Sequence, residues 1–244
     1  MRERTGRVPR LFVGSRLQPH AKIALEEDAA HHAARVLRLR EGDAVVLFDG
    51  RGGEFEARLY MPGRGAVLAE IGARHDIERE SPLMVTLVQA VSSSDKMDLT
   101  IQKSVELGVA AIQPVLAEKS VVRLSGERAA KKLAHWRRIA ISACEQCGRN
   151  RIPEIRELLD LARYRPQEAD CKILLAPSGE GRLAALARSP LTLAAGPEGG
   201  FSAEEEARLV AAGFARARLG PRILRTETAA LAALAALNAL AGDL

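Results

Sequence analysis

Short apolar runs alternate with helical patterns through the last two thirds of this 244-residue chain. Residues 83–91, 109–116, 172–176 and 191–195 have the length and composition of strands that are buried on both faces. Residues 96–107, 127–147 and 157–164 are expected to form helices, and in the second of these Leu133, Trp136 and Ala140 recur three or four positions apart. Alternation of this kind predicts a parallel α/β sheet.

The N-terminal part has a different pattern. Strands are expected at residues 11–13, 44–48, 54–60 and 66–71, and one helix at 28–39 with Val36 and Leu39 on its apolar side. Asp49-Gly50-Arg51-Gly52-Gly53 is typical of a hairpin turn. Short strands with glycine turns predict a small β-barrel. Because the pattern changes before Pro82, we expect two domains, residues 1–72 and residues 73–244.

Two glycine-bearing loops lie close together near the C-terminus, at residues 196–200 and 219–222. Between them, Ser202 and Glu205 form the capping-box pattern of a helix that we expect to end at Gly213. The last predicted helix, 228–240, is Ala and Leu almost all round, so it must be buried in the core or against another subunit. Neither loop has a Gly-Lys-Ser/Thr or G-x-G-x-x-G pattern, which disfavours a dinucleotide enzyme. The residues alone indicate a small-molecule pocket beside a buried helix.

The net charge of +5 is concentrated in two segments. Residues 1–16 hold five Arg and one Glu, which gives +4, and residues 119–165 hold 12 basic and five acidic residues, which gives +7. Basic patches suit a polyanion such as RNA, because binding to phosphate releases counterions. On charge alone, solvated helix faces explain the pattern equally well. The aromatic content of 3% is too low for a platform that stacks single-stranded bases.

Several classes of protein are disfavoured by composition. The N-terminal residues MRERTGRV lack an apolar core, so we expect no signal peptide, and no run of 18 apolar residues predicts a membrane helix. An odd number of cysteines, three, favours a reducing compartment over a disulfide framework. We therefore expect a cytoplasmic protein that does not contact membranes.

The cysteine and histidine patterns do not favour a metal site. Cys144-x-x-Cys147 lacks two further ligands at zinc spacing, and both cysteines are expected at the C-terminal end of a helix, where thiolates are not stabilised. His31 and His32 are adjacent, so on a helix their side chains point apart. We expect buried or incidental thiols and no metal.

Longer motifs identify the chain as similar to a known family. It resembles the bacterial 16S ribosomal RNA uracil-N3 methyltransferases of the SPOUT superfamily, which act on uridine 1498. The resemblance covers essentially the whole chain. Its C-terminal motifs are Gly196-Pro197-Glu198-Gly199-Gly200-Phe201-Ser202 and Leu219-Gly220-Pro221-Arg222-Ile223-Leu224-Arg225-Thr226-Glu227-Thr228-Ala229, with Lys96-Met97-Asp98-Leu99, Ala143-Cys144-Glu145-Gln146-Cys147-Gly148-Arg149 and Phe48-Asp49-Gly50 upstream. Cys147 stands where Ser is common in the family, which argues against a catalytic thiol.

The resemblance implies a PUA-like N-terminal β-barrel and a C-terminal α/β domain whose parallel sheet is tied in a trefoil knot. It also implies a homodimer with the final helix at the interface, and 16S rRNA or the small ribosomal subunit as substrate. The two glycine loops are then expected to bind S-adenosylmethionine through backbone groups, since side chains would fill the space. The implied cofactor-binding residues are Leu175, Ala176, Gly196, Pro197, Glu198, Gly199, Gly200, Leu219, Gly220, Pro221, Ile223, Leu224, Thr228 and Ala229.

The implied reaction also assigns roles to charged residues. Uracil N3 carries a proton that must leave, and Glu198 and Glu227 are the acids near the loops that could accept it. Arg225 is expected to steady the charge that develops on the uracil carbonyls. RNA is expected to contact Arg7, Arg10, Arg16, Arg149 and Arg151. Two rival interpretations are a ribose 2′-O-methyltransferase on the same fold, and an RNA-binding or ribosome-assembly protein without a donor pocket.

Overall fold

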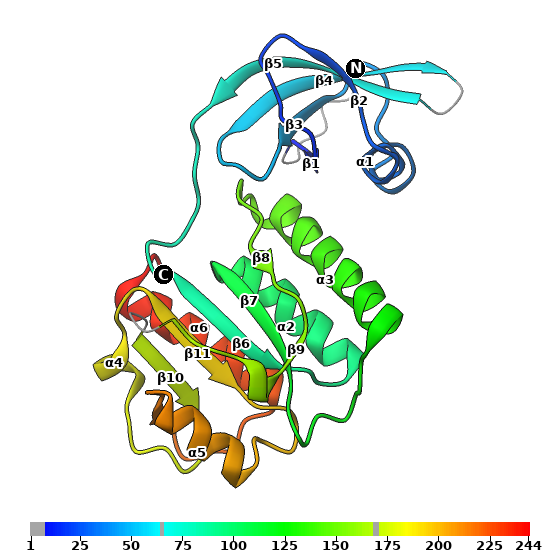
Figure 1. Cartoon of the computed structure of the whole chain (residues 1–244). Coiled ribbons are helices and arrows are strands. Elements are labelled where there is room, and N and C mark those ends of the chain that lie inside the picture. Colours follow the sequence, from blue (N-terminus) through cyan, green and yellow to red (C-terminus); the bar gives the residue numbers. More distant parts are fainter. Residues whose placement is uncertain (1–7, 64–65, 168–170) are drawn as a thin grey trace. The chain divides into compact units, whose positions relative to one another are not determined.

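The computed structural model describes residues 8–63, 66–167 and 171–244, which form two compact units. The first unit comprises residues 1–80 together with 144–152, and the second comprises 81–143 and 153–244. Both are shown in Figure 1. No helix of the described residues is long and apolar enough to cross a membrane.

The first unit is built on a five-stranded sheet in the order β1-β3-β4-β5-β2. The strands are β1 (Arg10–Phe12), β2 (Lys22–Ala24), β3 (Ala44–Phe48), β4 (Glu54–Gly63) and β5 (Ala66–His75). All pairs are antiparallel except β1 with β3. Alternate residues point into one core, among them Val45 and Leu47 on β3 and Ala57 and Leu59 on β4. The period of two in these strands therefore explains which face is buried.

The helix of this unit is shorter than the sequence predicted. It consists of α1 (Glu27–His31) and a π-helical turn over His32–Val36. Arg38 then adopts a left-handed conformation, with φ +53°, which ends the helix. Leu39 is buried as expected, but Val36 is 58% exposed, so its placement on the apolar side was wrong.

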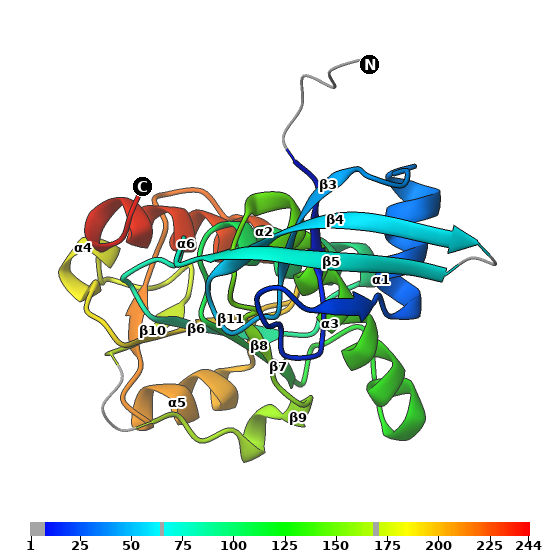
Figure 2. The same ribbon diagram turned by 90° about the horizontal axis from the view of Figure 1, so that it is seen from above.

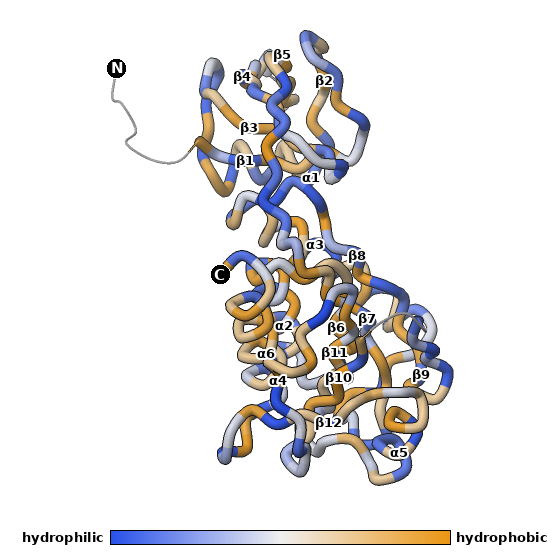
Figure 3. The backbone as a smooth tube through the Cα atoms, turned by 90° about the vertical axis from the view of Figure 1, so that its left-hand side faces the viewer, coloured by the Kyte–Doolittle hydropathy of each residue, from blue (hydrophilic) through white to orange (hydrophobic). Residues whose placement is uncertain are grey.

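The second unit is a seven-stranded sheet in which every pair is parallel. Its strands are β6 (Val85–Ala90), β7 (Ala111–Leu116), β8 (Glu154–Ile155), β9 (Leu159–Asp160), β10 (Cys171–Leu175), β11 (Leu191–Ala195) and β12 (Ala215–Ala217). The order is β12-β10-β11-β6-β7-β8, and β9 also pairs with β7. The four predicted apolar runs coincide with β6, β7, β10 and β11, which form the hydrophobic middle of the unit (Figure 3).

Helices cover both faces of this sheet. They are α2 (Ser94–Glu106), α3 (Gly126–Cys147), α4 (Leu183–Leu186), α5 (Ala203–Ala211) and α6 (Thr226–Ala241). Figure 2 shows α2 and α6 on one face and α5 on the other. The buried Asn238 of α6 donates to Leu107 O and accepts from Ser81, so one polar residue fixes this otherwise apolar helix against its neighbours.

The helix predicted at residues 157–164 is not formed. Leu159 and Asp160 instead pair with β7 as strand β9, and Leu161–Arg163 form one 3₁₀ turn. The Asp160 carboxylate accepts a hydrogen bond from Ala162 N. Pairing with the sheet and this side-chain capping compete successfully with a segment that is too short to be a stable helix by itself.

Candidate donor-binding pocket and the residues around it

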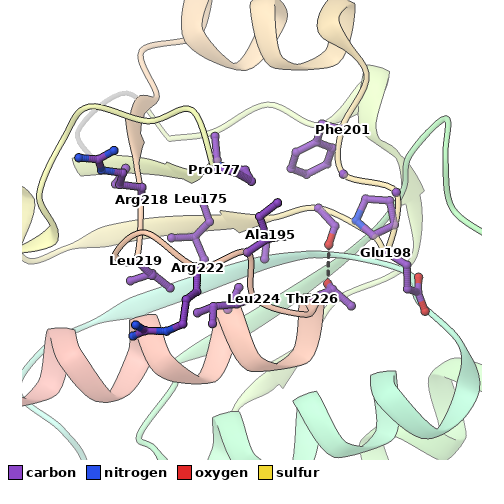
Figure 4. Close-up of a pocket in the computed structure, with 18 of the residues that line it drawn as sticks. Leu175, Pro177, Ala195, Glu198, Phe201, Arg218, Leu219, Arg222, Leu224 and Thr226 are labelled. Atoms are coloured by element: carbon purple, nitrogen blue, oxygen red, sulfur yellow. Dashed lines mark hydrogen bonds between the residues drawn. The ribbon is translucent and has the colours of Figure 1, made fainter.

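A pocket of about 300 Å³ opens in the second unit where the sheet strands end and α6 begins (Figure 4). The carboxyl ends of parallel strands are the usual place for ligands in open α/β sheets. The lining is largely apolar side chains and glycine backbone, from the ends of β10, β11 and β12 and from two loops. The lining residues are Leu175, Ala176, Pro177, Ala195, Gly196, Pro197, Glu198, Gly199, Gly200, Phe201, Glu206, Ala217, Arg218, Leu219, Gly220, Pro221, Arg222, Ile223, Leu224, Thr226 and Ala229.

The first loop, residues 196–200, is closed tightly on itself. A Cβ on Gly196 would lie 3.1 Å from Phe201 N and 3.2 Å from Gly200 Cα, which is tighter than ordinary van der Waals contact with backbone atoms. Gly200 has φ +68° and donates to Pro197 O at 2.9 Å, which completes the turn. Gly196 is therefore required for close approach and Gly200 for its backbone conformation.

The second loop, residues 219–224, lies on the other side of the pocket. Gly220 has φ +77°, and a Cβ there would meet nothing within 4 Å, so its glycine is explained by conformation alone. Leu219 and Leu224 lie with Leu175 beside the cavity (Figure 4), whereas Ile223 is 84% exposed. The loop therefore offers an apolar wall and free backbone groups to a small molecule.

Glu198 is the acidic residue of the first loop, and its carboxylate is already bonded. Its Oε1 accepts from Ser93 N at 3.1 Å and from Lys96 Nζ at 3.2 Å. Partial burial raises the pKa of Glu198, but hydrogen bonds from Ser93 N, its own N–H and Lys96 outweigh it and hold the pKa below its usual value. The geometry therefore makes Glu198 a weak proton acceptor that fastens the loop to the start of α2.

Most of the predicted cofactor-binding residues line this pocket together. The exception is Thr228, which is exposed and does not line the pocket, although Thr226 before it and Ala229 after it do. Of the predicted catalytic residues, Glu198 lines the pocket, while Arg225 and Glu227 flank the lining residue Thr226. Arg225 is exposed, and the buried Oε2 of Glu227 has no hydrogen-bond partner among the described residues.

Sequence reasoning missed several lining residues. Thr226 lies between the predicted catalytic residues Arg225 and Glu227, and Phe201 directly follows the first glycine loop. Adjacency to a predicted loop was the available signal for both. Pro177, Ala195, Glu206, Ala217 and Arg218 were also missed, whereas Arg222 lies in the second predicted loop.

Arg10 and Arg149 do not present their guanidinium groups to solvent. Arg10 is 5% exposed and pairs with Glu54 and Asn150, and Arg149 is 4% exposed and pairs with Glu80. A guanidinium that is buried and paired with a carboxylate is less accessible to an RNA phosphate. This burial and pairing favour a structural role for both arginines within the first unit, and their contact with RNA stays a prediction.

The other predicted RNA-binding arginines have different positions. Arg16 is exposed and lies beside Arg51 and Arg74 at a pocket of the first unit. Arg151 is exposed and pairs loosely with Glu78, at 3.4 Å. Arg7 lies outside the described residues.

The cysteines and histidines are not gathered into a metal site in the described part of the chain, where no group of three or more His, Cys, Asp or Glu side chains converges. Cys144 is buried, and burial raises the pKa of its thiol to about 12. At neutral pH this thiol is protonated and unreactive.

Comparison with known proteins places this fold in a family. Residues 79–238 match the profile of an RNA methyltransferase domain, and residues 25–72 match that of an RNA methyltransferase PUA domain. The chain belongs to the RNA methyltransferase family. The match spans the whole parallel sheet and both loops of the pocket.

Full-length relatives agree with this assignment. The chain is 37% identical to ribosomal RNA small subunit methyltransferase E of Buchnera aphidicola from Schizaphis graminum, over 98% of both chains. It is 33% identical to the Bacillus subtilis protein of the same name, over 88% of this chain and 89% of the relative.

Solved structures of RNA methyltransferases show the same fold. Ribosomal RNA small subunit methyltransferase E from Neisseria gonorrhoeae, bound to S-adenosyl methionine, has a TM-score of 0.91 at 43% identity, covering 97% of this chain and 99% of the other. A Legionella pneumophila protein in complex with the bound cofactor SAM has a TM-score of 0.94 at 40% identity, covering 98% of this chain and 100% of the other. These neighbours confirm the predicted SPOUT-like α/β sheet with a PUA domain at the N-terminus.

Proposed function

We propose that this chain methylates N3 of uridine 1498 in 16S rRNA, with S-adenosylmethionine as methyl donor. Small-subunit ribosomal RNA methylation is the activity in the names of its full-length relatives. The position in the RNA rests on the resemblance of the two C-terminal motifs. The single observation that carries the proposal is the glycine-walled pocket at the strand ends, in a fold shared with a relative solved with the donor bound.

The residues of the pocket fit S-adenosylmethionine. An adenosine group needs an apolar wall, which Leu175, Leu219 and Leu224 supply, and close backbone approach, which Gly196 and Gly220 permit. Bound there, the donor would supply an electrophilic methyl group on a cationic sulfur. The task of the chain is then to hold the two substrates in line and to remove the N3 proton.

We assign the proton acceptor role to Glu227 rather than to Glu198. Glu198 is committed to Ser93 and Lys96, and its lowered pKa weakens it as a base. Glu227 keeps one carboxylate oxygen without a partner among the described residues, directly after the lining residue Thr226. Arg225, exposed on the other side of Thr226, is assigned to the developing charge on the uracil carbonyls.

Single-turnover methylation of 16S rRNA tests these roles. Because general base catalysis contributes about 100-fold or more, Glu227→Gln is expected to slow methyl transfer by at least that factor. Glu198→Gln keeps the size of the side chain and is expected to slow transfer by less than about tenfold. If the double variant methylates at the wild-type rate, neither residue is the base.

Nucleoside analysis of rRNA tests the product. Small-subunit RNA from a strain without the gene is expected to lack 3-methyluridine at position 1498, and the wild-type gene is expected to restore it. Loss of a ribose methyl group instead would favour the 2′-O-methyltransferase interpretation. An unchanged profile together with no donor binding would favour a role in ribosome assembly without catalysis.

We further propose that the protein acts as a cytoplasmic homodimer, with α6 at the interface. Leu240 of this helix is 53% exposed, and Leu231 and Ala235 are only partly covered within the chain. Sedimentation equilibrium of the wild-type protein is expected to give twice the mass of one chain. A single-chain mass at all concentrations would contradict the dimer.

A further inference from the structure

A buried glutamine lies behind the donor pocket and does not line it. Gln89 is near the end of β6, is fully buried, and stands opposite Ala195 of β11 in the sheet register. Its Nε2 donates to Ala90 O at 3.0 Å and to Thr226 Oγ1 at 3.1 Å. A buried side-chain amide in a central strand needs a reason, since burying an amide is costly unless its partners are well placed.

The hydrogen bonds of this group have a single possible direction. A backbone carbonyl can only accept, so the amide atom that faces Ala90 O is the nitrogen. The same nitrogen donates to Thr226 Oγ1, which leaves the one hydroxyl proton of Thr226 to be donated elsewhere. That proton goes to Gly196 O, the contact drawn as a dashed line in Figure 4.

We propose that Gln89 is a positioning residue for S-adenosylmethionine, acting through Thr226 on the carbonyl of Gly196. Gly196 begins the first pocket loop and has no side chain to restrict its peptide plane. A rigid strand residue therefore sets the orientation of a glycine peptide in the pocket loop. Thr226 lines the pocket and Gln89 does not, so Gln89 affects the pocket only through its hydrogen bond to Thr226.

The inference rests on the proposed use of this pocket for S-adenosylmethionine. It goes further by naming what holds the binding loop in shape before the donor arrives. Without Gln89, the Thr226 hydroxyl is free to rotate, and the Gly196 carbonyl loses a fixed donor. We expect the loop to adopt other conformations for part of the time. The affinity for S-adenosylmethionine then falls in proportion to the fraction of molecules that keep the binding conformation.

The chain offers a closely matched control. Gln113 on the adjacent strand β7 is also buried, and its Nε2 donates to the carbonyl of the next residue, Pro114, at 2.9 Å and to Glu157 O at 2.8 Å. Neither partner lines the donor pocket. Gln113→Leu therefore removes the same number of hydrogen bonds from the same sheet.

Calorimetry with S-adenosylmethionine measures the effect on affinity. We expect Gln89→Leu and Thr226→Val each to weaken binding about tenfold, and the double variant to be no weaker than either single one. Thr226→Ser keeps the hydroxyl and is expected to stay within about twofold of wild type. RNA affinity is expected to be unchanged in all of these variants, and donor affinity unchanged in Gln113→Leu.

Hydrogen exchange of the donor-free protein measures the same role without any ligand. The amides of residues 198–200 are expected to exchange faster in Gln89→Leu and Thr226→Val than in wild type or Gln113→Leu. Equal exchange in the Gln89 and Gln113 variants, or fully additive losses of affinity, would overturn the positioning role. Failure of the wild-type protein to bind the donor would instead reject the proposed function, and exchange would still decide whether Gln89 holds the loop.

Discussion

Gly196 and Gly220, one in each pocket loop, are glycines for different physical reasons. A Cβ on Gly196 would lie only 3.1–3.2 Å from backbone atoms of Gly200 and Phe201, so the loop would have to shift by a few tenths of an ångström. Gly220 has open space around its missing Cβ, and only its φ of +77° excludes other residues. An L-residue in that conformation costs about 1–2 kcal/mol. A substitution of Gly220 therefore introduces backbone strain without a steric clash.

Gly220→Ala is expected to weaken S-adenosylmethionine binding by roughly five- to tenfold, because the loop shifts to relieve the strained φ. Gly42 is a matched control in the first unit, with φ +84° and no atom within 4 Å of an added Cβ. Gly42→Ala is expected to lower stability by a similar amount and to leave donor affinity unchanged. Titration calorimetry of both variants makes the comparison, and equal affinities in the two would contradict it.

The residues of the pocket were largely predictable, and the buried residues behind it were not. Gly196 and Gly220 stand in motifs that are long enough to be specific. Gln89 is a polar residue within a mostly apolar run, and its partner Thr226 is 137 positions away. Local patterns carry no information on which distant hydroxyl meets a buried amide. The ion pairs of Arg10 and Arg149 could not be predicted for the same reason, since their carboxylate partners, Glu54 and Glu80, are distant in the sequence.

At the start of α5, the capping box of Ser202 and Glu205 also forms a tertiary contact. Ser202 accepts from Glu205 N at 3.3 Å and Glu205 Oε2 accepts from Ser202 N at 2.9 Å, which completes the predicted capping box. The other oxygen of Glu205 accepts from Glu118 N at 2.8 Å, in the loop after β7. One buried carboxylate therefore caps a helix and joins it to a neighbouring loop.

Ser202→Ala is expected to lower the free energy of unfolding by about 1 kcal/mol through loss of the cap. Glu205→Ala is expected to cost more, about 2 kcal/mol or above, because Glu118 N also loses its acceptor. Glu204 is exposed in the same helical turn, so Glu204→Ala is the control and is expected to change little. Urea denaturation measures all three, and equal losses for Glu204 and Glu205 would contradict a bridging role.

Element prediction succeeded where tertiary packing and local pattern agree. Strands β3 and β11 have the predicted bounds, and the helix predicted at 127–147 is α3 with one further residue at its start. It failed for the segment at 157–164, where pairing with β7 decides the structure. Strand β2 was missed because Lys22–Ala24 is short and largely exposed, with Ile23 between two exposed residues, whereas the equally short edge strand β1 is largely buried.

Over the molecule as a whole, a buried ionic network ties together parts of the first unit that are far apart in the chain. Glu54 is 8% exposed and accepts from Arg10, from Arg79 at 3.0 Å and from Asn150 at 3.2 Å. Burial alone would raise the pKa of Glu54, but the hydrogen bonds from Arg79, Arg10 and Asn150 outweigh it and lower the pKa from 4.5 to about 2.

This lowered pKa predicts a loss of stability in acid. The contribution of Glu54 is fully present above its unfolded pKa of 4.5 and is lost as the pH falls toward its folded value of about 2. The difference corresponds to at most about 3 kcal/mol. Urea denaturation at about pH 7 and about pH 3 is expected to show a smaller change in Glu54→Gln than in wild type.

Glu70 provides the comparison for that measurement. It lies on β5 in an exposed ion pair with Lys22 at 3.6 Å, which contributes little to stability. Glu70→Gln is expected to retain the wild-type pH dependence. A Glu54→Gln variant that loses as much stability in acid as the wild type would exclude Glu54 as a source of the effect.

The first unit draws one of its pieces, residues 144–152, from the middle of the chain. That piece supplies Asn150 to the Glu54 network and Arg149 as the partner of Glu80. A recombinant N-terminal fragment that stops at residue 80 would leave the buried Arg10 and Glu54 without Asn150, and Glu80 without Arg149. Anyone who wishes to study RNA binding by this unit in isolation must graft residues 144–152 onto the fragment through a linker.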